Sequence, residues 1–446
     1  MNKKSLEKLE RELDAYVEEL TTGMGRAERR AAMGHYVTGL LLDGERKSIE
    51  PIAARLVDRP DEVQAMRQRL QQCVVVADWA ETEIFNRIAL KLERELPNVE
   101  ALIIDDTGFE KKGEHSVGVQ RQYSGTTGRT ENCQIATTLH LASELASGCI
   151  GARLYLPESW ALDAERRKKA GIPEEVEFLE KWRLALGLID EALAVGVGRH
   201  VVLADAGYGD NGEFRRELDA RRLEYVVAVA GKHVLWRPEA MPVRTPIRNG
   251  KNFGYVDKKH PPITIADYAS TLSYRTITWR EGSRGTQRSR FAAIRIRSAS
   301  SHSRGQPPGE LTWLLCWWPH DAPKPCKFWL SNLPADTSMK RLVHLAKLRW
   351  RVERDYQEMK GELGLDHFEG RTWRGFHHHA ALCAAAHAFL ALRRALFPPE
   401  PDQVDLADGA SASAANTSTS TAVLPALRPT KRQSQPPVGL LAHVIE

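Results

Sequence analysis

The chain has 446 residues, of which 42% are hydrophobic and 27% charged, a composition typical of a soluble globular protein with two or three domains. Its formal net charge of +5 fits a nucleic-acid partner without requiring one. Six scattered cysteines without a C-x-x-C pair indicate neither a zinc knuckle nor a disulfide framework, and no apolar run approaches the ~20 residues of a membrane-spanning helix.

The first 95 residues are predicted to form a helical region that binds DNA. The first apolar residues recur with a period of 3.6, and a second helix is expected over 25–46. Residues 47–72 should form short helices broken at Pro51 and Pro60. A short helix, a turn and a longer helix are compatible with a helix-turn-helix DNA reader. They are equally compatible with a plain helical bundle, and the sequence leaves both open.

Residues 96–230 change to a pattern of strands followed by alternating helices and strands. The expected strands are 99–105, 115–123, 131–143, 200–205 and 224–230. The first three can form an antiparallel meander, and the last two, reached through helices, should run parallel to the first. This is the order of an RNase H-like core, so the fold class is predicted to be α/β, with a mixed sheet flanked by helices.

Three further segments follow this first part of the core. Residues 231–335 contain short strand-like runs and are predicted to be a β-rich insertion. Residues 336–397 return to a helical pattern and are expected to complete the core. Residues 398–446 are rich in Pro, Ser, Thr and Ala, which predicts a disordered tail.

Acidic residues stand at the ends of two predicted strands. LIIDDTGF places Asp105 and Asp106 after one apolar run, and VVLADAGYG places Asp205 after another. The two strands should be neighbours, so their terminal acids should converge. A third carboxylate from a nearby helix would complete an oxygen-rich site suited to Mg²⁺ or Mn²⁺. Taken singly, each aspartate is more often a cap or turn residue.

A helical stripe in LRWRVERDYQEMKGELGLDHFEGR carries charges of both signs. Arg349, Glu353 and Lys360 lie at i, i+4 and i+11, with Tyr356 beside them. Glu353 could be only the surface partner of Arg349. Together with the strand-end acids, it is instead a candidate third carboxylate.

These segments resemble the DDE transposases of bacterial insertion sequences, in the group with a Y-x2-R-x3-E-x6-K signature. Arg349, Glu353 and Lys360 match its R, E and K, whereas the Y position is Ala346 here. LIIDDTGFEKKGEHSVGVQRQYSGTTGRTENCQ is similar to the first-acid block, and VLADAGYGDNGEFRREL to the second. The resemblance covers about residues 100–395. The departure at Ala346 removes one expected phosphate contact but leaves the acids in place.

The resemblance implies a catalytic and metal-binding triad. Its expected members are Asp105, Asp205 and Glu353, which would hold two Mg²⁺ or Mn²⁺ ions. Asp105 is preferred to Asp106 because neighbouring residues of a strand point to opposite faces.

The resemblance also implies DNA contacts near the acids. Arg349 and Lys360 would grip phosphates of the transposon end, and Tyr356 would support this face. Lys111 and Lys112 follow the first acid and could bind DNA, although a solvated loop is equally compatible. Tryptophans of the insertion could hold a flipped base or could form its core.

The implied function is cut-and-paste transposition in a bacterial cytoplasm, on the nucleoid. The enzyme would cleave at the terminal inverted repeats by two-metal phosphoryl transfer and join the freed 3′-hydroxyl to target DNA. The expected partner is double-stranded DNA, bound by a dimer, with no membrane. The alternative is a domesticated or inactive DNA-binding regulator with the same fold.

Overall fold

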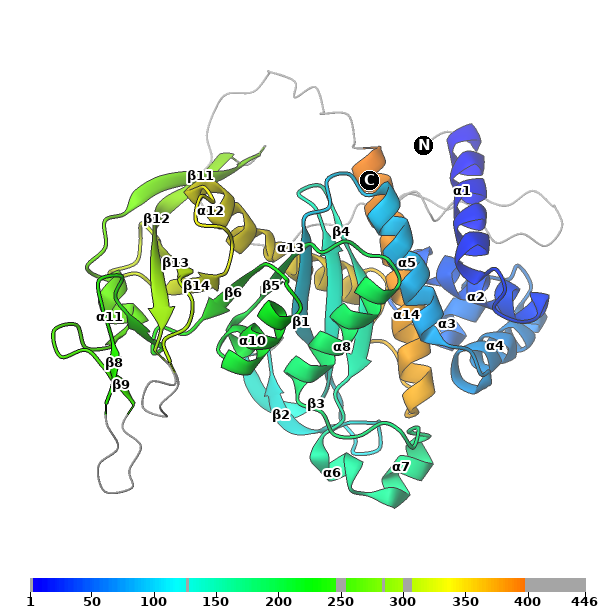
Figure 1. Cartoon of the computed structure of the whole chain (residues 1–446). Coiled ribbons are helices and arrows are strands. Elements are labelled where there is room, and N and C mark those ends of the chain that lie inside the picture. The colour runs from blue at the N-terminus through cyan, green and yellow to red at the C-terminus, as the bar shows by residue number, and fades with distance from the viewer. Residues whose placement is uncertain (1–2, 126–127, 246–253, 283–284, 300–306, 398–446) are drawn as a thin grey trace.

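The computed structural model describes residues 3–125, 128–245, 254–282, 285–299 and 307–397 (Figure 1). The predicted disordered tail, 398–446, lies outside these ranges. Among the described residues, no helix is long and apolar enough to cross a membrane. All six cysteines are free thiols.

Helices fill the N-terminal part of the chain. They are α1 (Lys3–Thr21), α2 (Ala27–Leu41), α3 (Ile49–Arg55), a 3-10 turn η1 (Pro60–Glu62), α4 (Val63–Gln71), a π turn η2 (Gln72–Val76) and α5 (Glu81–Glu95). Pro60 starts η1, as predicted. Pro51 does not break a helix: it lies in the first turn of α3, where its missing N–H would have no partner in the helix.

The middle of the chain builds a mixed sheet. Its core strands are β1 (Ala101–Glu110), β2 (Gln120–Ser124), β3 (Arg129–Ala142), β4 (Ser147–Leu154), β5 (Val201–Ala204) and β6 (Tyr225–Val229). β1 pairs antiparallel with β3 and parallel with β5, and β5 pairs parallel with β6. The spatial order β4–β3–β1–β5–β6 confirms the predicted RNase H-like sheet flanked by helices.

One predicted strand of the meander was wrong. Residues 115–123 were expected to be its second strand, but β2 covers only Gln120–Ser124 and pairs with the first residues of β3. The third strand of the meander is β4, which was not predicted. Its sequence, SGCIGARL, contains two glycines and is buried at all but one position, so it lacks the alternation by which strands are recognised.

The predicted β-rich insertion extends the core sheet. Its strands are β7 (Val234–Trp236), β8 (Val243–Arg244), β9 (Tyr255–Val256), β10 (Ile263–Thr264), β11 (Arg275–Gly282), β12 (Gly285–Ser298), β13 (Thr312–Trp318) and β14 (Lys327–Ser331), with the short helix α11 (Ile265–Ala269). β14 pairs antiparallel with β6. The sheet therefore runs without a break from the core into the segment 231–335, at the left of Figure 1.

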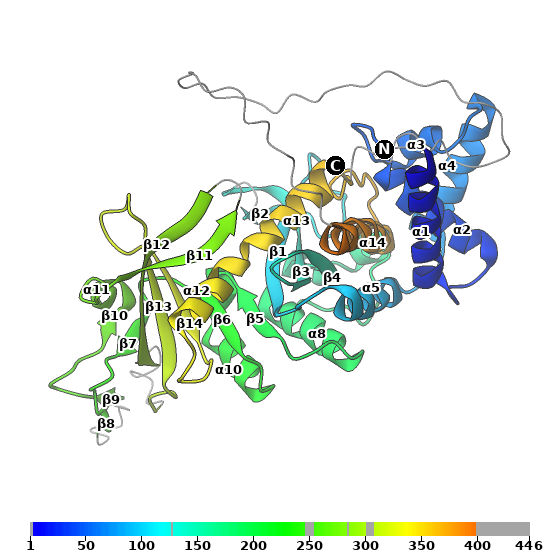
Figure 2. The ribbon, with the colours of Figure 1, turned by 90° about the horizontal axis from the view of Figure 1, so that it is seen from above.

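Helices cover both faces of the sheet. The remaining helices are α6 (Glu158–Ala161), α7 (Ala164–Ala170), α8 (Lys181–Ala194), α9 (Ala206–Gly209), α10 (Gly212–Ala220), α12 (Met339–Leu348), α13 (Trp350–Gly361) and α14 (Trp373–Leu396). Leu102 and Ile104 of β1 belong to the cluster that includes α5, α8 and α14. Ala101 and Ile103 face the cluster of α12. Figure 2 shows α12 and α13 on one side of the sheet and α8 and α10 on the other.

The N-terminal helices pack directly against α14. The Tyr16 hydroxyl donates to the Ala385 carbonyl at 2.7 Å, and the Tyr36 hydroxyl pairs with His379 Nδ1 at 2.9 Å. His378 stacks on Trp79 with ring centroids 3.6 Å apart. The helices therefore share one apolar core with the sheet, and the consecutive histidines of α14 serve packing.

Candidate active site

Asp105 lies in β1 and faces the side of the sheet covered by α12 and α13. Residues at odd positions of β1 point to this side, because side chains alternate along a strand. The carboxylate of Asp105 accepts a hydrogen bond from Arg349 Nη1 at 2.9 Å and is 14% exposed. A strand with a buried apolar start thus ends in a nearly buried charge.

Asp106 points to the opposite face and is fully engaged there. Lys181 Nζ of α8 lies 2.6 Å from its Oδ2, and the Tyr208 hydroxyl and Thr137 Oγ1 donate to its Oδ1. These partners make Asp106 a structural residue that ties α8 and α9 to the sheet. The two neighbouring aspartates have different partners and different faces.

Asp205 follows β5 directly and caps α9. Its carboxylate accepts backbone hydrogen bonds from Gly207 N at 2.9 Å and Tyr208 N at 3.4 Å. The short helix packs closely on β6: a Cβ at Gly209 would lie 1.9 Å from the Ala228 carbonyl oxygen, so this position requires glycine. The tight turn holds Asp205 at the end of β5, beside β1.

Arg349 connects two of the predicted acids. It stands at the junction between α12 and α13, and its guanidinium bonds Asp105 through Nη1 and Glu353 Oε1 through Nη2 at 2.7 Å. The Glu353 side chain is 61% exposed, in the first turn of α13. The cation therefore lies between a buried and an exposed carboxylate.

Burial and charge perturb both partners of this contact. Burial raises the pKa of Asp105 to about 6, and Asp205 adds to the rise, while Arg349 opposes it. Burial disfavours the charge of Arg349, but Asp105, Glu353 and Asp205 together raise its pKa. All three acids therefore act electrostatically on one guanidinium, and Asp105 holds excess negative charge poorly.

The donors fit a hard divalent cation in kind. Carboxylate oxygens are what Mg²⁺ and Mn²⁺ prefer, and the guanidinium supplies the positive charge between Asp105 and Glu353. The buried Thr107 hydroxyl, two residues from Asp105 on the same face of β1, has no hydrogen-bond partner. Within the described residues, no three His, Cys, Asp or Glu side chains gather closely enough to hold a metal ion. Coordination by all three acids would require Arg349 to leave Asp105 and Glu353 to turn inward.

The predicted DNA-contacting residues have protein partners in this structure. The Tyr356 hydroxyl is 2.6 Å from Thr138 Oγ1, Lys360 Nζ donates to the Gly108 carbonyl at 2.8 Å, and Lys111 Nζ donates to the Phe368 carbonyl at 3.0 Å. Lys112 is exposed. Ala346, at the tyrosine position of the signature, is buried against the sheet.

A buried polar network behind the acids was not predicted. Asp355 of α13 accepts hydrogen bonds from His140 Nδ1 of β3 and from Ser147 Oγ of β4, both at 2.7 Å. His140 Nε2 lies 3.2 Å from Thr138 Oγ1, which also contacts Tyr356. The pair fixes α13 to the sheet two residues after Glu353, and Thr138 is paired in register with Asp105.

Charge complementarity stabilises this network. Burial would raise the pKa of Asp355, but His140, His387 and Ser147 lower it. Burial would lower the pKa of His140, but Cys149 and Asp355 raise it. The only sequence signals were a histidine inside an apolar strand and an aspartate on the inner face of a helix, and these do not reveal that the two meet.

Tryptophans of the insertion pack within the fold. Trp329 is buried, and the indole N–H groups of Trp313 and Trp317 donate to Pro334 O and Ser289 Oγ. Lys347 of α12 lies 3.2 Å from the centroid of the Trp317 ring, and burial lowers its pKa to about 8. The insertion thus supports the helix that leads into Arg349.

Comparison with known proteins adds an independent line of inference. A family model described as DDE superfamily endonuclease matches residues 19–286. The match includes Asp105 and Asp205 but ends before α12 and Glu353. A protein of Microchaete diplosiphon named "Probable transposase for insertion sequence element IS701" is 30% identical over 200 residues. The aligned part covers 44% of this chain and 47% of that protein, so the chain spans about half the length of this relative.

Proposed function

The chain belongs to the DDE superfamily endonuclease family, and from this premise we propose that it is the transposase of an insertion sequence. It would cleave phosphodiester bonds at the ends of its element and join the freed 3′-hydroxyl to target DNA. The relative named as a probable transposase supports this assignment. The single observation that carries it is the arrangement of Asp105, Asp205 and Glu353 around Arg349.

The proposed catalytic residues each have a distinct task. Asp105 and Asp205, at the ends of the adjacent parallel strands β1 and β5, would hold the cations from the sheet. Glu353, exposed at the start of α13, would close the site once DNA is present. Two Mg²⁺ or Mn²⁺ ions, when bound, would activate the attacking oxygen and stabilise the leaving one.

Arg349 is proposed to exchange partners during the reaction. Without DNA, its guanidinium offsets the charge of Asp105 and Glu353. With metal charge on the carboxylates, the guanidinium would be released to a phosphate of the transposon end, for which its planar donors are suited. Lys360, Lys111 and Lys112 are proposed to lie along the same strand, with Tyr356 packed behind them. The DNA-bound form would be a dimer, because two ends must be joined.

A hydrolytic nuclease and a DNA-binding regulator would share this fold. The regulator is disfavoured by the presence of all three acids in one electrostatic group. A nuclease would cleave but would not form new joints between the element's end and target DNA.

A cleavage and strand-transfer assay distinguishes these functions. The substrate is a duplex that carries the inverted repeat flanking the gene, with Mn²⁺ and a supercoiled target plasmid. The wild type is expected to nick at the repeat and to form joint products. Asp105→Ala, Asp205→Ala and Glu353→Ala should each lose cleavage by about 100-fold or more but still bind the repeat. Cleavage without joints would indicate a nuclease, and binding without cleavage by the wild type would indicate a regulator.

A further inference from the structure

The N-terminal helices contain a polar groove at the end of the molecule opposite to β7–β13 (Figure 1). The groove lies between α2 and the continuous helix formed by α4 and η2, with a volume of about 880 Å³. Its lining includes Arg26, Glu28, Arg29, Ala32, Ala65, Gln68, Arg69, Gln71, Gln72, Cys73, Val76 and Ala77. Three arginines against one glutamate give it a positive charge.

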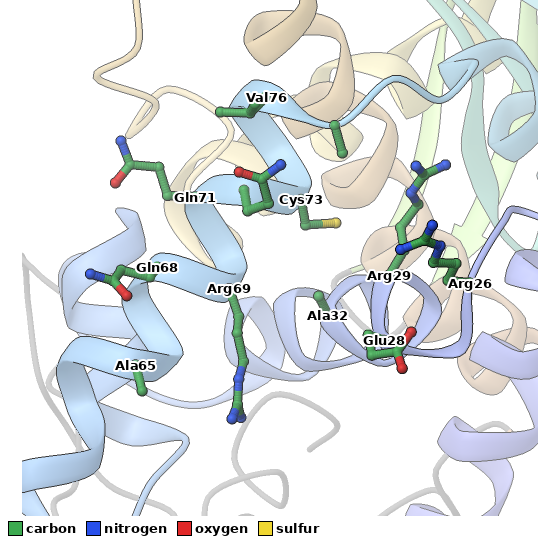
Figure 3. A pocket seen from close by; sticks show the side chains of 12 residues that line it. Arg26, Glu28, Arg29, Ala32, Ala65, Gln68, Arg69, Gln71, Cys73 and Val76 are labelled. Carbon is green, nitrogen blue, oxygen red and sulfur yellow. The ribbon is translucent and has the colours of Figure 1, made fainter.

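The cations of the groove have few acidic partners of their own. Arg26 and Arg69 are exposed and form no ion pair within the described part of the chain. Arg29 donates to the Asp78 carbonyl at 3.0 Å, which anchors its side chain at the groove wall. Neighbouring arginines outside the groove are instead neutralised, as in the pair of Arg59 with Asp61. Figure 3 shows Arg69 projecting from α4, with Arg26 and Arg29 near the start of α2.

α4 presents an unusual outer face. Met66 and Leu70 anchor the helix in the apolar core, and no acidic residue occurs in Val63–Gln71. Gln68 and Gln72 are exposed one turn apart. Arg67 donates to Gln64 Oε1 at 3.0 Å and to Gln71 Oε1 at 2.9 Å, so that these side chains are held in fixed positions along the helix.

We propose that α4 reads DNA bases in the major groove and that the flanking arginines Arg26 and Arg69 hold the adjacent phosphates. Glutamine contacts both the N6 and N7 edges of adenine, and arginine contacts guanine in the same way. A helix fits the major groove of B-DNA, whereas the deep, narrow major groove of A-form RNA excludes it. Within Val63–Gln71, Ala65 is the only exposed apolar residue, so the helix lacks the large apolar anchors of a protein interface.

This assignment resolves the ambiguity between a helix-turn-helix reader and a plain bundle. α3 precedes α4 and packs against it, as the supporting helix of such a reader does. The inference rests on the proposed function, because the sequence that α4 would read is the end of the element.

The test is selection from a pool of short random-sequence duplexes, followed by affinity measurements across a salt series. The wild type should enrich one sequence motif. Gln68→Ala/Gln72→Ala should lose about tenfold or more of the preference for that motif over a scrambled duplex. Arg26→Ala/Arg69→Ala should weaken binding to every duplex and reduce the salt slope of log K by about 0.9 for each phosphate that is no longer bound.

Arg11→Ala/Arg216→Ala is the matched control, because it removes the same net charge from exposed positions outside the groove. It should retain the motif and most of the affinity. All variants change exposed side chains, and their thermal unfolding should match that of the wild type.

The inference is overturned if the glutamine variant enriches the wild-type motif with unchanged affinity. It is also overturned if the wild type enriches no motif, or if the control variant loses as much affinity as Arg26→Ala/Arg69→Ala. Cleavage of the repeat-bearing duplex by the wild type, measured on the same preparation, shows whether the proposed function fails as well. An active wild type with an indifferent α4 would refute only the base-reading role.

Discussion

At the scale of single residues, Asp105 and Asp106 show how adjacent aspartates acquire different tasks. Asp106 is satisfied by Lys181, Tyr208 and Thr137, whereas Asp105 is nearly buried beside other acids. Good solvation and good pairing stabilise a fold, and poor solvation of a charge leaves it available for a cation. The two residues should therefore respond in opposite ways to the same isosteric change.

Asp105→Asn is expected to stabilise the metal-free protein at neutral pH. Between the ordinary pKa of 3.8 and about 6, the folded protein holds a proton at Asp105 that the unfolded chain has released. Stability from this site therefore falls as pH rises through this window. In chelator at pH 8, thermal unfolding should show a gain of up to about 2 kcal/mol for Asp105→Asn, and the gain should vanish below pH 4.

Asp106→Asn is the matched control and should destabilise the protein. The loss of charge-assisted hydrogen bonds to Lys181 and Tyr208 should cost about 1–3 kcal/mol. If Asp105→Asn destabilises as much as Asp106→Asn at pH 8, Asp105 is a structural residue and its assigned role is wrong.

At the scale of elements, the position of α13 determines where Glu353 lies. The contact of Asp355 with His140 and Ser147 joins the helix to β3 and β4 within the apolar interior. Glu353 itself is exposed and cannot fix its own position. The buried pair therefore acts as a positioning device for the third acid.

Double-mutant analysis of Asp355→Ala and His140→Ala tests this device. Each single change should cost about 3–5 kcal/mol of unfolding free energy, because it leaves a buried partner unpaired. The double variant should cost less than the sum by about 1–3 kcal/mol. At a temperature where each variant stays folded, Mn²⁺-dependent cleavage should fall while binding to end DNA is retained. Additive costs with normal cleavage would show that the pair does not position Glu353.

Sequence patterns could predict the elements that carry the acids but not all the contacts between elements. The rule that active groups gather at the ends of adjacent parallel strands was enough to place Asp105 and Asp205 together. Alternation along β1 was enough to separate Asp105 from Asp106. β4 was missed because a fully buried strand with glycines has no alternating pattern. The pairing of His140 with Asp355, which are 215 residues apart, depends on tertiary packing that no local pattern encodes.

At the scale of the whole molecule, the helices before residue 96 form part of the core. The Tyr16 and Tyr36 hydroxyls bond to α14, and Arg393 of α14 pairs with Glu12 of α1. The family match begins at residue 19, so it too treats helices α2–α5 and the sheet as one unit. A groove that reads DNA is thereby held at a fixed distance from the acids.

Deletion of residues 1–95 should therefore prevent folding of the remaining chain. The deletion would expose the apolar surface of α14 and leave His378 and His379 without partners. The expected observation is an aggregated product, and a single cooperative thermal transition for the full chain. The milder change Tyr36→Phe should cost about 0.5–1.5 kcal/mol without loss of folding. A soluble fragment 96–446 with its own cooperative transition would contradict this description.

The central claim is that acids from β1, the end of β5 and the start of α13 hold the cations that cut DNA. A switch in metal specificity tests it most directly, because a thiolate accepts softer cations than a carboxylate does. Asp205→Cys and Asp205→Ala should both be inactive on the repeat-bearing duplex in Mg²⁺. In Mn²⁺, the cysteine variant should recover part of its cleavage, whereas the alanine variant should not. Wild-type cleavage by Asp205→Ala in Mg²⁺, or equal recovery of both variants in Mn²⁺, would contradict metal coordination by Asp205.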